Sequence, residues 1–387
     1  MMKHNWSRIL LQFRLNAQDI RVRDIIRVEN WGSMKPRTDV VQAIAGIAFL
    51  SLVLLPVEAG AVKWEKEIGG ETLSIQPFGF MQITAEALDG TASGDDDDSV
   101  RFDADRVRLG YNLSWGKVFN KLQLDFNRND ISKKTAGLPE IIKDALVGYT
   151  FHEAAKFQIG MFKTPVGMDF NVSGKKLDIT KRGMEKSLVL ERSLGAMMSG
   201  SKIGPGFGYD VGIFNPTTRS SAVTGGDAGD QQGYAARLRY DLDKALHAEI
   251  SYGASEEAGG VGTEDYAVWD LAAAYYWRDL TLKAEYIAGS NVRGADGRDQ
   301  TVWLAHAGYR FHPMFEGIVR HYQGETDPSN TSLGNTFFGL NIFLKPDKKE
   351  AARIQVNYVL ASGDKDDWSG IGGYTDDALL VQFQVSF

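Results

Sequence analysis

The last ten residues of the chain, 378–387, alternate between two kinds of side chain, and this alternation most constrains the fold. In an extended strand, one face carries Leu379, Val381, Phe383, Val385 and Phe387, and the other carries Leu380, Gln382, Gln384 and Ser386. Such a strand can place one face in lipid and the other in water, and a closed barrel leaves no unpaired backbone edge in the hydrocarbon. The pattern therefore favours the closing strand of a transmembrane β-barrel. An edge strand of a soluble sandwich is the alternative that these residues alone leave open.

The same alternation recurs upstream, where sixteen strand-like segments follow one another between Leu73 and Phe387. Their connections alternate in length. Short turns such as 278–279 hold a few residues, whereas connections such as 215–232 are long and rich in Gly, Asp, Ser and Asn. Short periplasmic turns and long outer loops are typical of outer-membrane barrels, and a soluble β-protein gives no reason for this alternation. We therefore predict an all-β fold, a transmembrane antiparallel β-barrel of about 16 strands.

The composition excludes several other classes of protein. The mean hydropathy of −0.25 excludes a bundle of transmembrane helices but not a barrel, which hides its apolar surface in alternation. The chain has no Cys, so it has no disulfide and no thiolate metal site, and no pair among its six His residues has the spacing of a metal or catalytic motif. No Ser/His/Asp or carboxylate/His set converges on the outer loops. We therefore expect no enzymatic activity and no cofactor.

Four consecutive Asp residues, 95–98, lie in the first predicted outer loop. Their oxygens could bind a divalent cation, but a solvated acidic loop tip is the interpretation that we prefer. We therefore predict no metal site.

The N-terminal part of the chain has the order of a secretory signal peptide. Two basic residues precede an apolar run from 40 to 55, and a small-residue segment ends at Ala61. The run is short for a membrane span and polar sequence follows at once, so we predict cleavage after Ala61 rather than an anchor. The predicted organisation is an upstream extension at 1–33, a signal peptide at 34–61 and an outer-membrane barrel domain at 62–387. The extension is either untranslated, with Met34 as the initiator, or part of a long basic signal sequence.

Several stretches along the chain together resemble one family of outer-membrane proteins. They are 106–113 (RVRLGYNL), 143–149 (KDALVGY), 159–166 (IGMFKTPV), 187–193 (SLVLERS), 284–286 (AEY), 338–341 (FGLN) and 384–387 (QVSF). In this order they are similar to the phosphate- and polyphosphate-selective porins (porin O and P) of Gram-negative outer membranes. The resemblance extends over most of the chain, from near Ile75 to the end.

The resemblance implies a sixteen-stranded porin, exported through the periplasm to the outer membrane, where it contacts lipid and lipopolysaccharide as a homotrimer. Its third loop is expected to fold into the pore. Lumenal arginines and loop lysines are expected to attract small anions such as phosphate or polyphosphate. No nucleic-acid partner is expected.

The connection between the fifth and sixth predicted strands, 156–162 and 195–202, is the longest in the chain and is basic. It carries seven Lys or Arg and four Asp or Glu, whereas the whole chain has a net charge of −7. The constriction-loop candidates are Lys175, Lys176, Lys181, Arg182 and Lys186. Cations on a loop that narrows a water path form a favourable field for a partly dehydrated anion. A solvated outer loop of mixed charge is the alternative.

The barrel wall gives mixed indications. The predicted pore-lining cations are Arg106, Arg108, Arg237, Arg239, Arg320 and Arg353. Inward-facing acids nearly balance the basic residues of the wall, so the wall alone predicts no strong selectivity. Arg106 and Arg108 are the best candidates because both lie mid-strand on the polar face. Pairing of these arginines with lumenal carboxylates, which would stabilise the barrel interior, is the structural alternative.

The function that we predict is an outer-membrane porin, a water-filled channel for passive diffusion of small anions such as phosphate or polyphosphate. A general or other-substrate porin without strong anion selectivity is the alternative. The ion preference of the open channel would distinguish the two.

Overall fold

The computed structural model describes residues 63–88, 99–127, 134–135, 138–139, 141–216, 231–256, 264–327, 329–370 and 372–387. The predicted upstream extension, the signal peptide and the acidic run 95–98 lie outside these residues and stay predictions. No helix in the described part of the chain is long and apolar enough to span a membrane.

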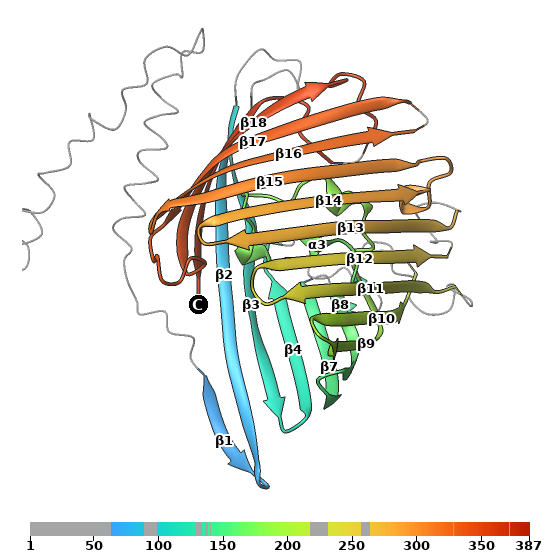
Figure 1. The fold of residues 1–387 in the computed structure, drawn as a ribbon, viewed down its shortest axis with the longest axis vertical. Helices are drawn as coiled ribbons and strands as arrows, with labels where there is room; N and C mark the ends of the chain where they lie inside the picture. The colour runs from blue at the N-terminus through green and yellow to red at the C-terminus, as the bar shows by residue number, and fades with distance from the viewer. Residues whose placement is uncertain are drawn as a thin grey trace, which may run out of the picture. The chain divides into compact units, whose positions relative to one another are not determined.

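Sixteen strands of the described residues form a closed antiparallel barrel (Figure 1). They are β2 (Glu71–Leu88), β3 (Ser99–Trp115), β4 (Val118–Asp125), β7 (Ile142–His152), β8 (Ala155–Lys163), β9 (Arg192–Gly204), β10 (Phe207–Phe214), β11 (Gly233–Leu242), β12 (Leu246–Ser255), β13 (Tyr266–Trp277), β14 (Leu280–Ser290), β15 (Gln300–His312), β16 (Phe315–Thr326), β17 (Thr331–Phe343), β18 (Ala352–Gly363) and β19 (Ala378–Ser386). Each strand pairs with its neighbours along the chain. Strand β19 pairs with β2 from Ala378↔Leu88 to Ser386↔Phe80, which closes the ring. The predicted fold and strand number are confirmed.

Three short strands in the described part of the chain lie outside the ring. β1 (Trp64–Ile68) forms a hairpin with the lower end of β2, where Trp64 pairs with Ile75 and Ile68 with Glu71 (Figure 1). β5 (Lys134–Thr135) and β6 (Leu138–Pro139) form a separate two-stranded sheet. A short 3-10 turn, η4 (Val292–Gly294), follows β14.

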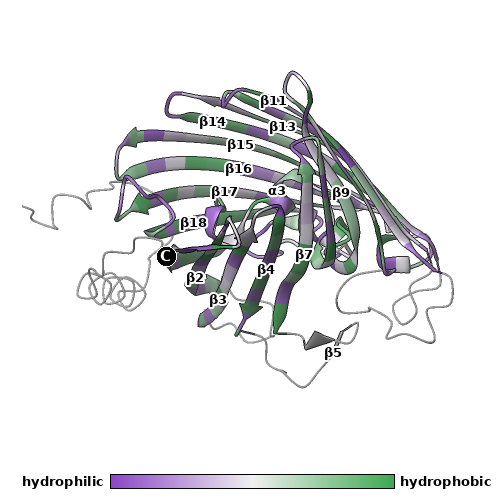
Figure 2. Cartoon of the chain, turned by 90° about the horizontal axis from the view of Figure 1, so that it is seen from below, coloured by the Kyte–Doolittle hydropathy of each residue, from purple (hydrophilic) through white to green (hydrophobic). Residues whose placement is uncertain are grey.

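Side chains alternate across the barrel wall, so hydrophobic and hydrophilic residues alternate along the strands (Figure 2). Outward-facing Leu271 and Tyr309 are 56% and 58% exposed, whereas inward-facing Gln355 and Gln382 are fully buried. Lipid would cover the outer side chains, and this explains the exposed apolar surface. The alternation shifts once in β3: the pairing with β2 moves between Gln82 and Ile83, so Asp105 becomes an extra residue beside Arg106.

The connection between β8 and β9, residues 164–191, folds into the barrel. It contains the helix α3 (Met168–Asn171) and the 3-10 turns η2 (Gly174–Lys176) and η3 (Met184–Leu188), and Figure 2 shows α3 inside the ring of strands. Its apolar side chains, such as those of Val166 and Leu188, join a buried cluster with inward-facing residues of the wall. This inserted loop, as predicted, is the third long connection of the barrel.

Side chains of the wall hold the inserted loop in place through its backbone. The bonds to residues 174–180 are Gln82 Nε2 to Gly174 O (3.0 Å), Gln384 Nε2 to Lys175 O (3.1 Å), Gln355 Nε2 to Leu177 O (3.2 Å), Thr180 N to Asn357 Oδ1 (2.9 Å) and Gln382 Nε2 to Thr180 O (3.1 Å). The wall residues come from β2, β18 and β19. These bonds satisfy backbone groups of the loop inside the barrel and so help the loop to lie against this wall.

Three buried ion pairs add to this attachment. Arg320 of β16 contacts Asp169 (3.1 Å) and Asp178 (2.8 Å), and Lys283 of β14 contacts Asp178 at 2.6 Å. Burial acts to raise the pKa of the Asp178 carboxyl, but Lys283 and Arg320 outweigh it and hold that pKa well below its usual range. The loop is thus fixed to one half of the barrel, and the open space remains beside the other half.

Candidate functional site

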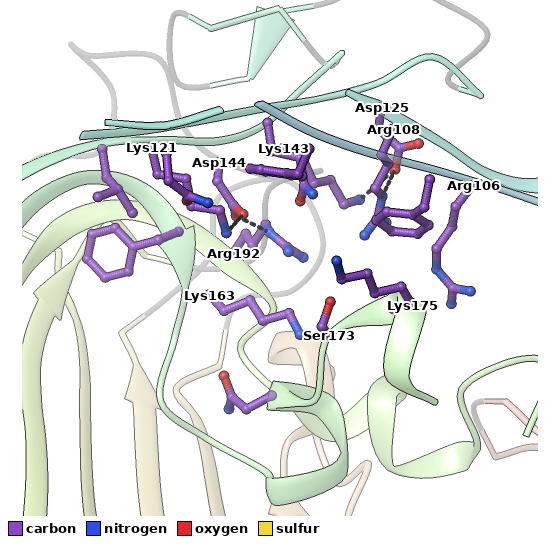
Figure 3. A pocket seen from close by; sticks show the side chains of 18 of the residues that line it. Arg106, Arg108, Lys121, Asp125, Lys143, Asp144, Lys163, Ser173, Lys175 and Arg192 are labelled. Carbon is purple, nitrogen blue, oxygen red and sulfur yellow. Dashed lines mark hydrogen bonds and ion pairs between the residues drawn. The ribbon is translucent and has the colours of Figure 1, made fainter. Parts of the chain in front are cut away.

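A cavity of about 1400 Å³ lies between the inserted loop and the wall formed by β2, β3, β4, β7, β8 and the start of β9. Twelve basic and four acidic residues line it. The basic residues are Lys63, Arg106, Arg108, Lys121, Lys143, Lys156, Lys163, Lys175, Lys181, Arg182, Lys186 and Arg192, and the acidic residues are Asp105, Asp125, Asp144 and Glu191. In Figure 3 the wall residues Arg108 and Arg192 and the loop residue Lys175 surround one open space. The cavity is therefore strongly basic.

Some of these cations share carboxylates. Asp125 contacts Arg108 (2.9 Å) and Lys143 (3.8 Å), and Asp144 contacts Lys121 (2.6 Å) and Arg192 (2.8 Å). Each carboxylate thus serves two cations, so every such group retains a net positive charge. The pairs also explain how so many basic residues can be partly buried at one wall.

Other cations of the cavity make no ion pair with a carboxylate of the described residues. Arg106 donates to Gln82 Oε1 at 2.6 Å, and Lys156 lies over the Phe119 ring at 4.0 Å from its centroid. Lys163 donates to the backbone oxygens of Phe170 and Val172, the latter at 3.1 Å. Arg182 donates to the backbone oxygens of Asp169 (2.6 Å) and Val172. Their partners carry no net charge, so no carboxylate neutralises these cations within the described residues.

The inserted loop approaches the wall arginines closely because Gly174 has no side chain. A Cβ at this position would lie 3.0 Å from Arg106 Nε and 3.4 Å from an Arg108 guanidinium nitrogen. A larger residue would displace the arginines or the loop. The cations of the wall and those of the loop therefore face the same narrow space.

The structure brings together six of the eleven predicted site residues and separates the others. Arg106, Arg108, Lys175, Lys181, Arg182 and Lys186 line the cavity. The other five do not line it. Arg237 and Arg239 contact Asp210, at 2.8 and 2.6 Å, and Arg320 contacts the inserted loop. Arg353 donates to Gln384 Oε1 (3.1 Å), and Lys176 contacts Glu350 (3.6 Å). Arg320 contacts the loop because the loop fills the barrel beside the later strands, whereas Arg237 and Arg239 pair with a carboxylate of the neighbouring strand β10.

Six basic residues of the cavity are absent from the predicted site residues: Lys63, Lys121, Lys143, Lys156, Lys163 and Arg192. Lys121 and Lys156 continue the polar faces of β4 and β8, so extending the alternation by one step would have found them. By the alternation of β7, Lys143 would share the outward face with Ala145 and Val147. A register shift between β4 and β7, where Gln123 pairs with Asp144 and Leu124 with Ile142, turns it inward.

A sixteen-stranded barrel with a loop folded into its interior and a polar cavity beside that loop is the architecture of an outer-membrane porin. The sequence also matches the family described as phosphate-selective porin O and P, over residues 78–387. The match covers most of the chain, and the protein belongs to this family. The predicted family and its location in the Gram-negative outer membrane are thereby confirmed.

Solved structures of porins resemble the barrel. The anion-selective porin from Comamonas acidovorans is 13% identical with a TM-score of 0.62, over 81% of this chain and 100% of that chain. OmpF of Salmonella typhi, in complex with daunomycin, is 13% identical with a TM-score of 0.60, over 84% and 100%. OmpT of Vibrio cholerae, in its trimer form, is 10% identical with a TM-score of 0.55, over 81% and 99%. At these identities the likeness concerns the fold alone. A comparison with curated protein sequences found no match.

Proposed function

We propose that this porin conducts small anions such as phosphate or polyphosphate by passive diffusion, without a catalytic step. The observation that carries the proposal is the excess of basic residues around the cavity, twelve against four, in a chain with a net charge of −7. An anion in a narrow water path loses part of its hydration, and cations of the wall offset that loss. Arg offers two parallel donors to an oxyanion and Lys a mobile point charge.

Several moderate cations suit conduction better than one strong site. Two unit charges about 4 Å apart interact by ~4 kcal/mol at an effective dielectric constant near 20, so a single deep well would trap the anion. The cavity contains both cations that are paired with shared carboxylates and cations that contact only neutral groups. Such an arrangement supports a series of shallow sites.

A general porin is the second candidate, and the ion pairs favour it. Arg108, Lys121 and Arg192 each contact a carboxylate, which weakens the field that each contributes. If the pairs dominate, the cavity would admit solutes by size alone.

The test replaces two cations of the cavity, Arg106 and Lys175, by Gln, because neither makes an ion pair with any residue that the structure describes. The matched control is Lys176→Gln, which changes the adjacent loop residue, one that contacts Glu350 and does not line the cavity. The reversal potential across a bilayer is measured in a salt gradient, together with the block of chloride current by phosphate. We expect the double variant, but not the control, to shift ion preference towards cations and to weaken the block.

Salt provides a second check on the same channel. The Debye length falls from ~10 Å at 0.1 M to ~3 Å at 1 M, so the difference between variant and wild type should shrink at high salt. Equal ion preference of wild type and double variant at low salt would leave the general porin as the better account.

We also propose that the protein is a homotrimer whose outer wall contacts lipid and lipopolysaccharide. The trimer form of the similar OmpT barrel supports the oligomeric state. Exposed outer residues such as Trp269 and Phe311, 43% and 58% accessible, support a lipid contact with interfacial aromatic residues. Crosslinking in intact membranes would test the trimer.

A further inference from the structure

The ring of Phe170 lies next to two cations of the cavity. Lys163 Nζ is 4.7 Å from the ring centroid and Arg182 Cζ is 5.4 Å from it. Phe170 belongs to α3, is 2% exposed and forms part of the cavity lining. Both distances are within the range of cation–π attraction, in which the negative face of the ring stabilises a positive charge.

The remaining partners of the two cations are neutral as well. Both donate to the backbone oxygen of Val172, Lys163 donates also to Phe170 O, and Arg182 to Asp169 O. No ion pair within the described residues involves either side chain. A carboxylate in place of the ring would hold the cations more strongly, but it would also cancel charge that an anion needs.

We propose that Phe170 is a positioning residue of the pore, which holds Lys163 and Arg182 side by side without neutralising them. The inference rests on the proposed anion conduction and concerns how the positive electrostatic field of the cavity is maintained. Two like charges that share one carbonyl repel each other, and the ring offsets part of that repulsion. An anion in the cavity therefore meets two adjacent cationic side chains that no carboxylate neutralises, which favours a divalent oxyanion such as hydrogenphosphate over chloride.

The experiment replaces Phe170 by 3,4,5-trifluorophenylalanine, which keeps the ring and its packing but weakens the negative face. We expect the concentration of phosphate that half-blocks the chloride current to rise about two- to five-fold, the factor that corresponds to a cation–π contact. A monofluorinated ring should give a smaller change. Phe170→Leu, which removes the ring entirely, should give at least the trifluoro effect.

The control position is Phe214 of β10, which is 3% exposed and does not line the cavity. Its ring packs against Phe162 at 5.6 Å between centroids, and no cation of the described residues lies over it. The same trifluorinated residue at this position should leave the phosphate block unchanged. A second control repeats the Phe170 replacement in a Lys163→Gln, Arg182→Gln background, where the effect should vanish.

The outcomes separate this inference from the proposed function. If the wild-type channel shows no preference for anions at low salt, the proposed function is wrong, and the inference about Phe170 is wrong with it. If the wild type prefers anions but fluorination at Phe170 leaves the block unchanged, or changes it equally in the Lys163→Gln, Arg182→Gln background, the positioning role is wrong and anion conduction stands. Because the fluorinated ring has nearly the natural shape, the test does not depend on whether Phe170→Leu folds.

Discussion

Glu185 of η3 is a buried carboxyl group that should make the stability of the inserted loop depend on pH. Its side chain is fully buried, and neither carboxyl oxygen has a hydrogen-bond partner among the described residues. The titratable groups that face it are Asp169 on α3, Arg182 on the loop, Glu285 on β14, and Arg320 and Tyr322 on β16. Burial, and next the Asp169 carboxylate, raise the pKa of Glu185 to about 7.

The sign of the effect follows from this raised pKa. Between the unfolded value of 4.5 and the folded value of about 7, the folded protein binds more protons than the unfolded chain. The favourable contribution is complete below pH 4.5 and is lost as the pH rises through 7. A shift of this size corresponds to about 3 kcal/mol, at 1.36 kcal/mol per pKa unit. Glu185→Gln should therefore stabilise the protein by up to about 3 kcal/mol at pH 8.5 and by little at pH 4.

The assay is urea-dependent unfolding from lipid vesicles at pH 4 and pH 8.5, with the wild type and Glu185→Gln compared at each pH. Glu191→Gln is the control on the same loop. Burial acts to raise the pKa of Glu191, but Lys186 and Lys143 outweigh it and lower that pKa, so this substitution should destabilise the protein more at the higher pH. An equal change in unfolding free energy for Glu185→Gln at the two pH values would refute the reasoning.

Three further predictions concern attachment of the loop, assembly and export. Arg320→Met should lower the unfolding free energy by about 3–5 kcal/mol, because it leaves Asp169 buried without its ion-pair partner and Asp178 with Lys283 alone, and should increase current noise as the loop loosens. A loss below about 1 kcal/mol, as for an exposed pair, would contradict it. Deleting Phe387, whose N–H donates to Gly79 O at 3.0 Å, should lower the folded, heat-modifiable fraction in outer membranes. Unchanged assembly would contradict the role of the closing strand. Mass spectrometry of the purified protein should show a mature chain that begins after Ala61, and an intact N-terminus would contradict the predicted cleavage.

The alternation of side chains was sufficient to predict the barrel, its number of strands and its closing strand. In a strand between lipid and water, apolar and polar side chains must alternate. Short periplasmic turns and long outer loops also follow one another in such a barrel, so both patterns can be recognised in the sequence. The inserted loop could be predicted as well, because it is long and basic and because its sequence resembles that of a known family. The side of the barrel on which it lies could not be predicted.

Which cations face the cavity was decided by the tertiary structure. Arg237 and Arg320 have the same inward parity as Arg106, yet the first pairs with Asp210 of the neighbouring strand and the second anchors the loop. Lys143 faces inward only because the pairing of β4 with β7 shifts by one residue. Periodicity in a sequence fixes which face of a strand a residue occupies. Whether that face meets water, a carboxylate or another segment depends on packing between residues that lie far apart along the chain, and only the folded barrel brings them together.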